Sequence, residues 1–298
     1  MGTTYEITID GFNDNASDIK ASVDSLLLDI NNIFSTYLID SEISNINNFK
    51  ENKQISISKD FYNVLKKSLY YCRLSNGSYD VTVAPLVELW GFGKNKDQII
   101  PTQNLINQSL EEIRYKNIYV DKGFLRKKNS SLSIDLNSIA KGYAVDEVYH
   151  LLKEYGYENF LVEIGGELRS SNTKEYNWYV GIANPFSNTI VNKIRLSNFS
   201  MATSGTYNNY FIYNDEKYSH IINPKNGYPY QYQLVSATII ANECIDADAL
   251  ATIALTMNVD EFLNIINSLD NTECFLVSVD KENNLFFKES ENFSDFID

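Results

Sequence analysis

The segment CIDADALAT, residues 244–252, places acidic and hydroxyl side chains within a strongly helix-forming run. On a helix, Asp248 and Thr252 lie one turn apart on the same face, so a carboxylate and a hydroxyl can point at one hard cation. The pair is typical of a Mg²⁺ site, because Mg²⁺ prefers oxygen ligands and keeps several waters. Asp246, roughly 200° around the helix, either caps the helix start or adds a carboxylate. A capped helix with a packed Thr252 is the structural alternative.

A phosphate-receptive helix start is predicted in SIDLNSIAKGYAVDEV, residues 133–148. A strand is expected to end at Asp135 and a helix to follow Asn137, which places Ser138 and Lys141 in its first turn. The free N–H groups and positive dipole end of such a turn favour an anion, and Lys141 adds a cation. A plain N-cap with a solvated lysine explains the segment as well.

Two glycines end the apolar run NFLVEIGGELR, residues 159–169. Gly165 and Gly166 permit close approach by a ligand or by another backbone segment, or form a tight turn. The run lacks the third glycine and the following helix of a dinucleotide fingerprint.

His220 precedes the rigid loop NPKNGYP and is one of two histidines. In that setting it can act as an acid, a base or a phosphate ligand, although a structural histidine is the alternative. His150 has no such setting. Aromatic residues supply another feature: Tyr79, Trp90 and Phe92 either form a face that stacks on a planar ring or belong to the core.

These stretches together indicate phosphoryl transfer on a nucleotide-like substrate, assisted by Mg²⁺. The net charge of 25 minus 39, or -14, argues against nucleic acid as a partner. Cys72, Cys244 and Cys274 are widely spaced and are expected to be buried thiols. The N-terminus lacks the pattern of a signal peptide, and no run reaches the length of a membrane span.

The elements that must position these residues are helices and short strands in irregular alternation. That alternation predicts one compact α+β unit with a largely antiparallel or mixed sheet. Residues 94–107 are expected to form a surface excursion, and the acidic tail is expected to be frayed. Helices are expected at 16–34, 59–74, 137–155, 244–257 and 260–269, and strands in TTYEITI, NIYV, LSID, NFLVEI, WYVGIA, NKIRL, YFIY, SATII and CFLVSV.

The chain resembles the ApbE family of FAD:protein FMN transferases. The resemblance implies an α+β, T-fold-like architecture with mixed or antiparallel sheets, and a single domain over 1–298. Within that domain, 94–130 is a variable excursion and 285–298 an acidic tail. The matching blocks run in order along the chain: MGTTYEI, FSTYLIDSEISNIN, YDVTVAPLVELWGFG, IDLNSIAKGYAVD, VEIGGELR, VGIANP, MATSGTY, YSHIINPKNGYP and ADALAT.

The same resemblance implies a reaction in which FAD is split at its pyrophosphate. The FMN phosphoryl group passes to a threonine of an acceptor flavoprotein, AMP is released, and Mg²⁺ is required. By position, the metal ligands are Ser138, Asp248 and Thr252, and the catalytic residue is His220. The residues implied to contact FAD are Met1, Tyr37, Ser78, Tyr79, Asp80, Asp135, Lys141 and Val235.

Two departures from the family pattern stand near the metal positions. Asn137 and Ser138 replace a small, glycine-rich pair, and Asp246 adds a carboxylate where a small hydroxyl residue is usual. The alternatives to transfer are a Mg²⁺-dependent FAD pyrophosphatase that gives FMN and AMP, and a non-catalytic FAD-binding protein. The resemblance also implies an acceptor that is an electron-transfer subunit of a membrane redox complex. It favours an extracytoplasmic lipoprotein on the cytoplasmic membrane, with the leader absent from this chain and a cytoplasmic location as the alternative.

Overall fold

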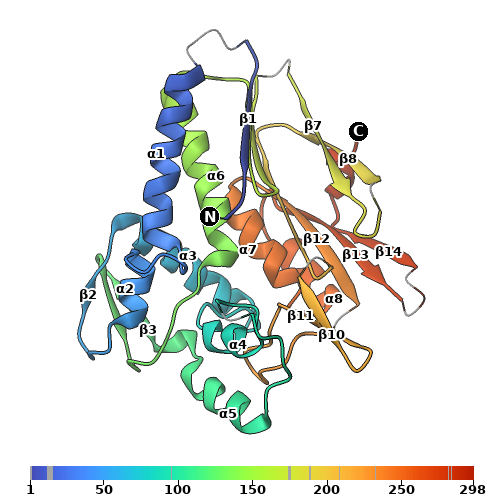
Figure 1. The fold of residues 1–298 in the computed structure, drawn as a ribbon. Helices are drawn as coiled ribbons and strands as arrows, with labels where there is room; N and C mark the ends of the chain where they lie inside the picture. Colours follow the sequence, from blue (N-terminus) through green and yellow to red (C-terminus); the bar gives the residue numbers. More distant parts are fainter. Residues whose placement is uncertain are drawn as a thin grey trace. The chain divides into compact units, whose positions relative to one another are not determined.

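The chain divides into two compact units in the computed structural model (Figure 1). The model describes residues 2–298 apart from 12–15, 95, 174–175, 188, 208, 232, 281 and 283. No described helix is both long and apolar enough to cross a membrane. The single domain over 1–298 stays a prediction. Unit 1 comprises Met1–Leu28, Ile139–Tyr207 and Tyr232–Asp298, and unit 2 comprises Asp29–Ser138 and Asn208–Gln231.

Unit 1 is built on a seven-stranded sheet with the order β1-β5-β6-β9-β12-β13-β14, in which every pairing is antiparallel. Two helices, α1 (Ala16–Phe34) and α6 (Asn137–Glu154), begin in one unit and end in the other. The other elements of unit 1 are β1 (Tyr5–Ile9), β5 (Phe160–Ile164), β6 (Glu167–Ser171), β7 (Trp178–Ala183), β8 (Ile190–Leu196), β9 (Ser200–Gly205), β12 (Leu234–Ala241), α7 (Cys244–Ala254), α8 (Val259–Ile266), β13 (Glu273–Val279), β14 (Leu285–Glu289) and η2 (Phe293–Phe296).

The interior strand β12, between β9 and β13, is buried at all eight of its positions. Helix α7 packs against β6, β9 and β12. An apolar cluster joins the sheet to the β7–β8 hairpin and to η2, through Ile182, Ile194 and Phe293 against Ile240 and Phe275. A strand buried in this way carries few polar side chains, which explains the apolar run LVSATIIA.

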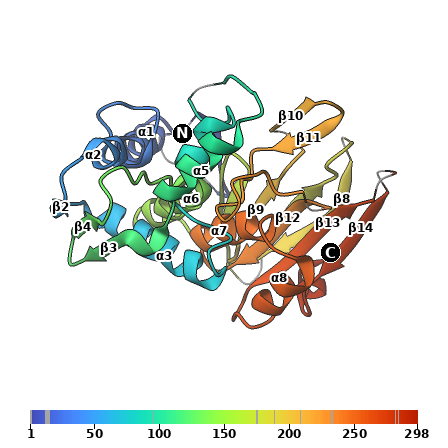
Figure 2. The ribbon, with the colours of Figure 1, turned by 90° about the horizontal axis from the view of Figure 1, so that it is seen from below.

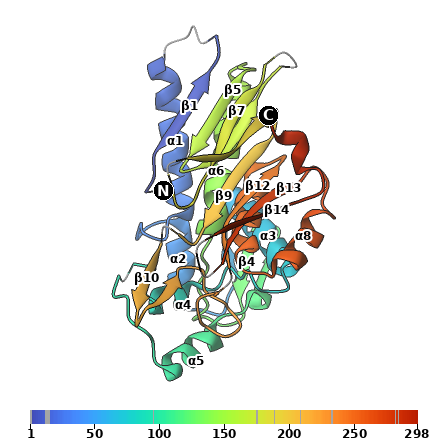
Figure 3. The same ribbon diagram turned by 90° about the vertical axis from the view of Figure 1, so that its right-hand side faces the viewer.

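The C-terminal segment is ordered rather than frayed, which corrects the expectation from its acidity. β14 pairs with β13 over five residues, from Val279↔Leu285 to Phe275↔Glu289. In η2, Phe293 is fully buried and stacks on Phe275. Figure 3 shows α8 beside β13. Apolar residues within the acidic tail therefore fix its position, because their burial outweighs the exposure of the charged residues around them.

Unit 2 contains a three-stranded sheet with the order β2-β4-β3, a separate β10–β11 hairpin and several helices (Figure 2). Trp90 is fully buried in its core, stacks on Tyr218 and donates from Nε1 to the backbone O of Gly227 over 2.8 Å. The elements are α2 (Glu42–Asn48), β2 (Ile55–Ser56), α3 (Lys59–Leu74), α4 (Ala84–Leu89), α5 (Gln103–Glu112), η1 (Tyr115–Asn117), β3 (Ile118–Asp121), β4 (Phe124–Lys127), β10 (Tyr210–Tyr213) and β11 (Glu216–Ser219).

Two sequence predictions are corrected in unit 2. The segment LSID is not a strand, because the N–H of Asp135 donates to the backbone O of Val81 in an irregular stretch. Residues 94–107 are not a plain surface excursion, since α5 begins at Gln103 and buries Ile106 completely. The five predicted helices are present, with α1 and α3 at the predicted bounds.

Candidate functional site

Asp248 lies on the buried side of α7, with 2% of its surface exposed. Its Oδ2 accepts a hydrogen bond from the backbone N–H of Gly142 on α6 over 2.9 Å. One turn further along α7, the Oγ1 of Thr252 lies 3.4 Å from the Oγ of Ser204 on β9. The structure therefore brings the predicted carboxylate and hydroxyl onto one helix at the predicted spacing, in contact with α6 and with the sheet.

Gly142 allows the close approach of α6 and α7. A Cβ atom at this position would lie 2.4 Å from the backbone O of Cys244 and 2.8 Å from the Cβ of Asp248. These distances are far below van der Waals contact, so any larger residue must move one of the helices. Gly142 thus fixes where the Asp248 carboxylate lies.

Asp146 binds the first N–H groups of α7, a role that the sequence analysis missed. Its two carboxylate oxygens accept from the N–H groups of Cys244 and Ile245, each over 2.9 Å, and Oδ1 also accepts from Arg169 over 2.5 Å. Burial raises the pKa of Asp146, while Arg169 opposes the shift. Asp246 is not the N-cap, because that position belongs to Glu243. The available signal was the acidic pair Asp146 and Glu147 within the otherwise apolar helical run GYAVDEV.

Lys141, Glu167 and Asp248 form a charged cluster at the start of α6. Lys141 makes an ion pair with Glu167, and its Nζ lies 3.9 Å from the Oδ1 of Asp248. Burial lowers the pKa of Lys141, but the Asp248 and Glu167 carboxylates outweigh that effect and raise it. Burial, followed by the charge of Asp248, raises the pKa of Glu167. Among the described residues, the Oε2 of Glu167 has no hydrogen-bond partner. Glu167 was not among the predicted site residues.

The donors in unit 1 fit a hard cation. Asp248 and Thr252 supply a carboxylate and a hydroxyl, and Mg²⁺ takes oxygen ligands while it keeps waters. The described part of the chain holds no group of three or more His, Cys, Asp or Glu side chains that could bind a metal. A cation here therefore needs hydroxyl, backbone, water or substrate oxygens beside the carboxylate.

Three of the predicted FAD contacts are consecutive in unit 2, at residues 78–80. The Oη of Tyr79 lies 2.8 Å from the Oγ of Ser138, which stands in the first turn of α6. The backbone O of Ser78 accepts from the Oη of Tyr230 over 3.2 Å. The Oδ1 of Asp80 accepts from Thr82, and its Oδ2 accepts from the N–H of Tyr115 over 3.0 Å. The Asp80 carboxylate thus holds its own loop together, and its role toward FAD stays a prediction.

His220 is held in unit 2 by a backbone contact. Its Nδ1 lies 3.1 Å from the backbone O of Asn209, and its ring meets the Phe92 ring edge to face. Desolvation lowers the pKa of His220, so the neutral imidazole is favoured. A neutral ring that donates from Nδ1 presents Nε2 as an acceptor. This arrangement suits a base.

The other predicted contacts are dispersed. Asp135 accepts the N–H of Asn137 over 2.8 Å, as the N-cap alternative expected, and desolvation raises its pKa. Tyr37 lies in the turn after α1 with 63% of its surface exposed, and Val235 is buried on β12. Met1 lies outside the described residues. Trp90 and Phe92 are core residues, as the alternative to ring stacking expected.

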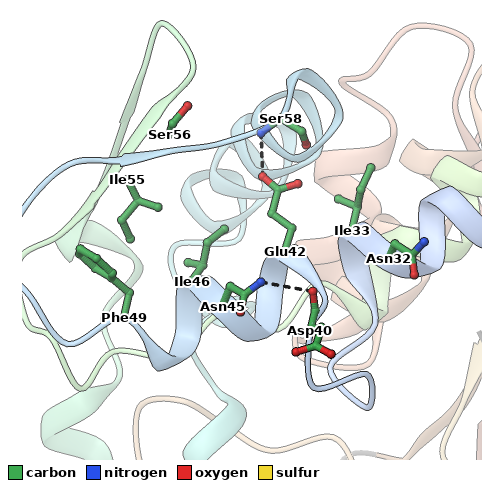
Figure 4. Close-up of a pocket in the computed structure, with 10 residues that line it drawn as sticks. All are labelled: Asn32, Ile33, Asp40, Glu42, Asn45, Ile46, Phe49, Ile55, Ser56 and Ser58. Atoms are coloured by element: carbon green, nitrogen blue, oxygen red, sulfur yellow. Dashed lines mark hydrogen bonds between the residues drawn. The ribbon is translucent and has the colours of Figure 1, made fainter.

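Unit 2 also has a shallow pocket of about 490 Å³. Figure 4 shows Glu42 accepting from the N–H of Ser58 within it, over 2.7 Å. None of the predicted site residues lines this pocket, so we assign it no part in the chemistry. Its lining consists of Asn32, Ile33, Asp40, Glu42, Asn45, Ile46, Phe49, Ile55, Ser56 and Ser58.

Comparison with known proteins places the chain in a family. The ApbE family model matches residues 1–276. The FAD:protein FMN transferase of Vibrio cholerae is 33% identical, over 100% of this chain and 90% of that protein. Its namesake from Haemophilus influenzae is 34% identical, over 98% of this chain and 88% of that protein.

Solved structures give the same result. The flavin transferase ApbE from Vibrio cholerae superposes with a TM-score of 0.90 at 31% identity, covering 99% of this chain and 96% of that one. The apo flavinyl transferase ApbE of Pseudomonas stutzeri gives a TM-score of 0.89 at 26% identity, over 99% and 94% of the two chains. The expected α+β ApbE architecture is confirmed. The chain belongs to the ApbE family.

Proposed function

We propose that this chain is a Mg²⁺-dependent FAD:protein FMN transferase. It cleaves the pyrophosphate of FAD, attaches FMN through a phosphoester bond to a threonine of an acceptor flavoprotein, and releases AMP. The relatives from Vibrio cholerae and Haemophilus influenzae, both FAD:protein FMN transferases, support the transferase activity. The observation that carries the rest is the buried Asp248, fixed by the Gly142 N–H one helical turn from Thr252.

The metal would be held by Asp248, Thr252 and Ser138. When bound, it would supply positive charge to the pyrophosphate and polarise the phosphorus that is attacked. An acidic protein with a net charge of -14 needs such a local cation to accept an anionic dinucleotide. Lys141 contributes a second positive charge near the same carboxylate.

His220 acts as the base for the incoming hydroxyl. A threonine hydroxyl is a poor nucleophile until a neighbouring base accepts its proton. The lowered pKa of His220 keeps the imidazole neutral, and the Asn209 contact leaves Nε2 available to accept that proton. Tyr79, Ser78 and Tyr37 are proposed to contact the flavin nucleotide, together with Asp80, Asp135, Lys141, Val235 and Met1.

Mass analysis of a threonine-containing acceptor protein, incubated with the enzyme, FAD and Mg²⁺, tests the proposal. A gain equal to one FMN, lost when a chelator is added, is the expected result. Free FMN and AMP with an unmodified acceptor would instead identify a pyrophosphatase. Persistence of intact FAD would identify a binding protein without turnover.

The acceptor and the compartment follow from the same proposal. We infer that the acceptor is an electron-transfer subunit of a membrane redox complex and that the enzyme acts as a lipoprotein on the outer face of the cytoplasmic membrane. Labelling of intact cells with a reagent that cannot cross the membrane tests the location. Protection of this protein under those conditions would place it in the cytoplasm.

A further inference from the structure

We propose that Glu167 is a positioning residue that holds the Lys141 ammonium off Asp248, so that Asp248 can receive a divalent cation. The inference rests on the proposed function, because it concerns the metal position assigned there. Two buried carboxylates, Glu167 and Asp248, lie within reach of Lys141, and the closer contact is with Glu167. The Nζ of Lys141 contacts Glu167 directly and stays 3.9 Å from the Oδ1 of Asp248.

The charges of the cluster explain why this contact matters. While the Lys141 ammonium pairs with Glu167, it does not occupy the Oδ1 of Asp248, which stays 3.9 Å away. Without the Glu167 carboxylate, Lys141 and Asp248 would neutralise each other as a buried ion pair. An added cation would then have to displace Lys141 from Asp248, and charge interactions in such a buried place are strong.

The backbone around Glu167 fixes its position. Gly165 and Gly166 form the two-residue turn between β5 and β6, with φ values of +64° and +102° that favour glycine. Glu167 is the first residue of β6, is paired with Ile164, and has 3% of its side chain exposed. The glycine pair thus sets the register of the residue that holds Lys141.

The unpartnered Oε2 of Glu167 supports the same role. Among the described residues, this buried oxygen accepts no hydrogen bond, although buried carboxylates are normally satisfied on both oxygens. A purely structural carboxylate would be expected to bind neighbouring N–H groups, as Asp146 does with Cys244 and Ile245. The other oxygen of Glu167 accepts from the Lys141 ammonium.

Calorimetric titration of MgCl₂ into the full chain tests the inference with four proteins: wild type, Glu167→Gln, Lys141→Met and the double variant. We expect Mg²⁺ to bind Glu167→Gln at least tenfold more weakly than wild type, because Lys141 then pairs with Asp248. Lys141→Met is expected to bind Mg²⁺ at least as tightly as wild type. The double variant is expected to regain the affinity that Glu167→Gln loses.

Recovery of Mg²⁺ affinity in the double variant distinguishes a positioning role of Glu167 from a structural one. If Glu167 only stabilised the fold, the added Lys141→Met substitution would not restore the affinity. Glu273→Gln is the matched control, since it removes another buried glutamate charge in unit 1, one that bonds to Ser290 and Asn292. Equal Mg²⁺ affinity of Glu167→Gln and wild type overturns the inference. So does a double variant as weak as Glu167→Gln, or a Lys141→Met variant that binds more weakly than wild type. A wild-type protein that binds no Mg²⁺ would instead overturn the proposed metal dependence.

Discussion

The backbone N–H of Gly142 on α6 donates to the Oδ2 of Asp248 on α7 over 2.9 Å, in a place where a Cβ on Gly142 would lie 2.8 Å from the Cβ of Asp248. The position of the Asp248 carboxylate thus depends on a glycine more than 100 positions away in the chain. The hydrogen bond occupies one carboxylate oxygen and leaves Oδ1 directed at Lys141. The proposed metal position follows from this helix crossing.

Asp248→Ala is expected to abolish FMN transfer that depends on Mg²⁺. The substitution removes the carboxylate that the proposal assigns to the cation and its hydrogen bond to the N–H of Gly142. The measurement is the acceptor mass shift at saturating FAD and Mg²⁺. Asp260→Ala serves as the control, because Asp260 is an exposed acidic residue of the same unit. Undiminished transfer by Asp248→Ala would remove the metal assignment.

Gly142→Ala is expected to destabilise the protein and to weaken Mg²⁺ binding. The added methyl group would meet the backbone of Cys244 at 2.4 Å, so α6 and α7 must separate at a cost of about 1–3 kcal/mol. Urea unfolding measures the loss. Gly181→Ala is the control, because its added Cβ meets the end of the Ile190 side chain, which can move. Equal losses in the two variants would contradict the tight crossing.

Asp146→Ala is expected to lower the free energy of unfolding by about 3–5 kcal/mol, because it leaves the Arg169 guanidinium, which is only 13% exposed, without its carboxylate partner. The N–H groups of Cys244 and Ile245 would also lose their acceptor. Asp146→Asn keeps one acceptor oxygen and should lose less. Urea denaturation of both variants, monitored by circular dichroism, gives the comparison. A smaller loss in Asp146→Ala than in Asp146→Asn would contradict the capping role.

His220→Ala is expected to leave FAD bound and to slow transfer by about 10²- to 10⁴-fold, the usual contribution of a general base. FAD binding is followed by flavin fluorescence and transfer by acceptor mass. Because desolvation lowers the pKa of His220, wild-type transfer should persist at pH values below those at which an ordinary histidine becomes protonated. His150→Ala, at an exposed position on α6, is the control. Loss of FAD binding in His220→Ala would contradict the assigned role.

The sequence predicted the elements that carry strong local patterns. The spacing of Asp248 and Thr252 on a helix and the burial of Cys72, Cys244 and Cys274 are confirmed. Local patterns could not show that Asp146 binds the start of α7, because that contact joins residues about 100 positions apart.

Glu167 was missed for a similar reason. Its role depends on a tertiary ion pair with Lys141, whereas the neighbouring glycines gave only a local turn signal. The segment around Asp135 was predicted as a strand from the short run LSID. In the structure its backbone bonds to Val81 and its carboxylate to the N–H of Asn137. The hydrogen bond from the Asn137 N–H to the Asp135 carboxylate, at the start of α6, replaces the strand pairing that was predicted.

Lys127 provides a test of pH-dependent stability that is independent of the proposed reaction. The side chain is buried, with 2% exposed, and its Nζ donates to the backbone O of Ile46 over 2.8 Å at the end of α2. Desolvation, followed by the charge of Lys50, lowers the pKa of Lys127 from 10.5 to about 8. Between about pH 8 and pH 10.5, the unfolded chain therefore holds a proton at Lys127 that the folded protein has lost.

The free energy of unfolding should consequently rise with pH across this window, by about 1–3 kcal/mol from this group, because the unfolded state binds more protons. Below pH 8, both states are protonated and the penalty for burying the charge is fully present. Lys127→Met should lack the rise, whereas Lys66→Met, at an exposed position of α3, should keep it. Urea denaturation at pH 7, 8, 9 and 10 measures the slopes. Identical slopes for Lys127→Met and wild type would show that Lys127 stays charged in the folded protein throughout this window.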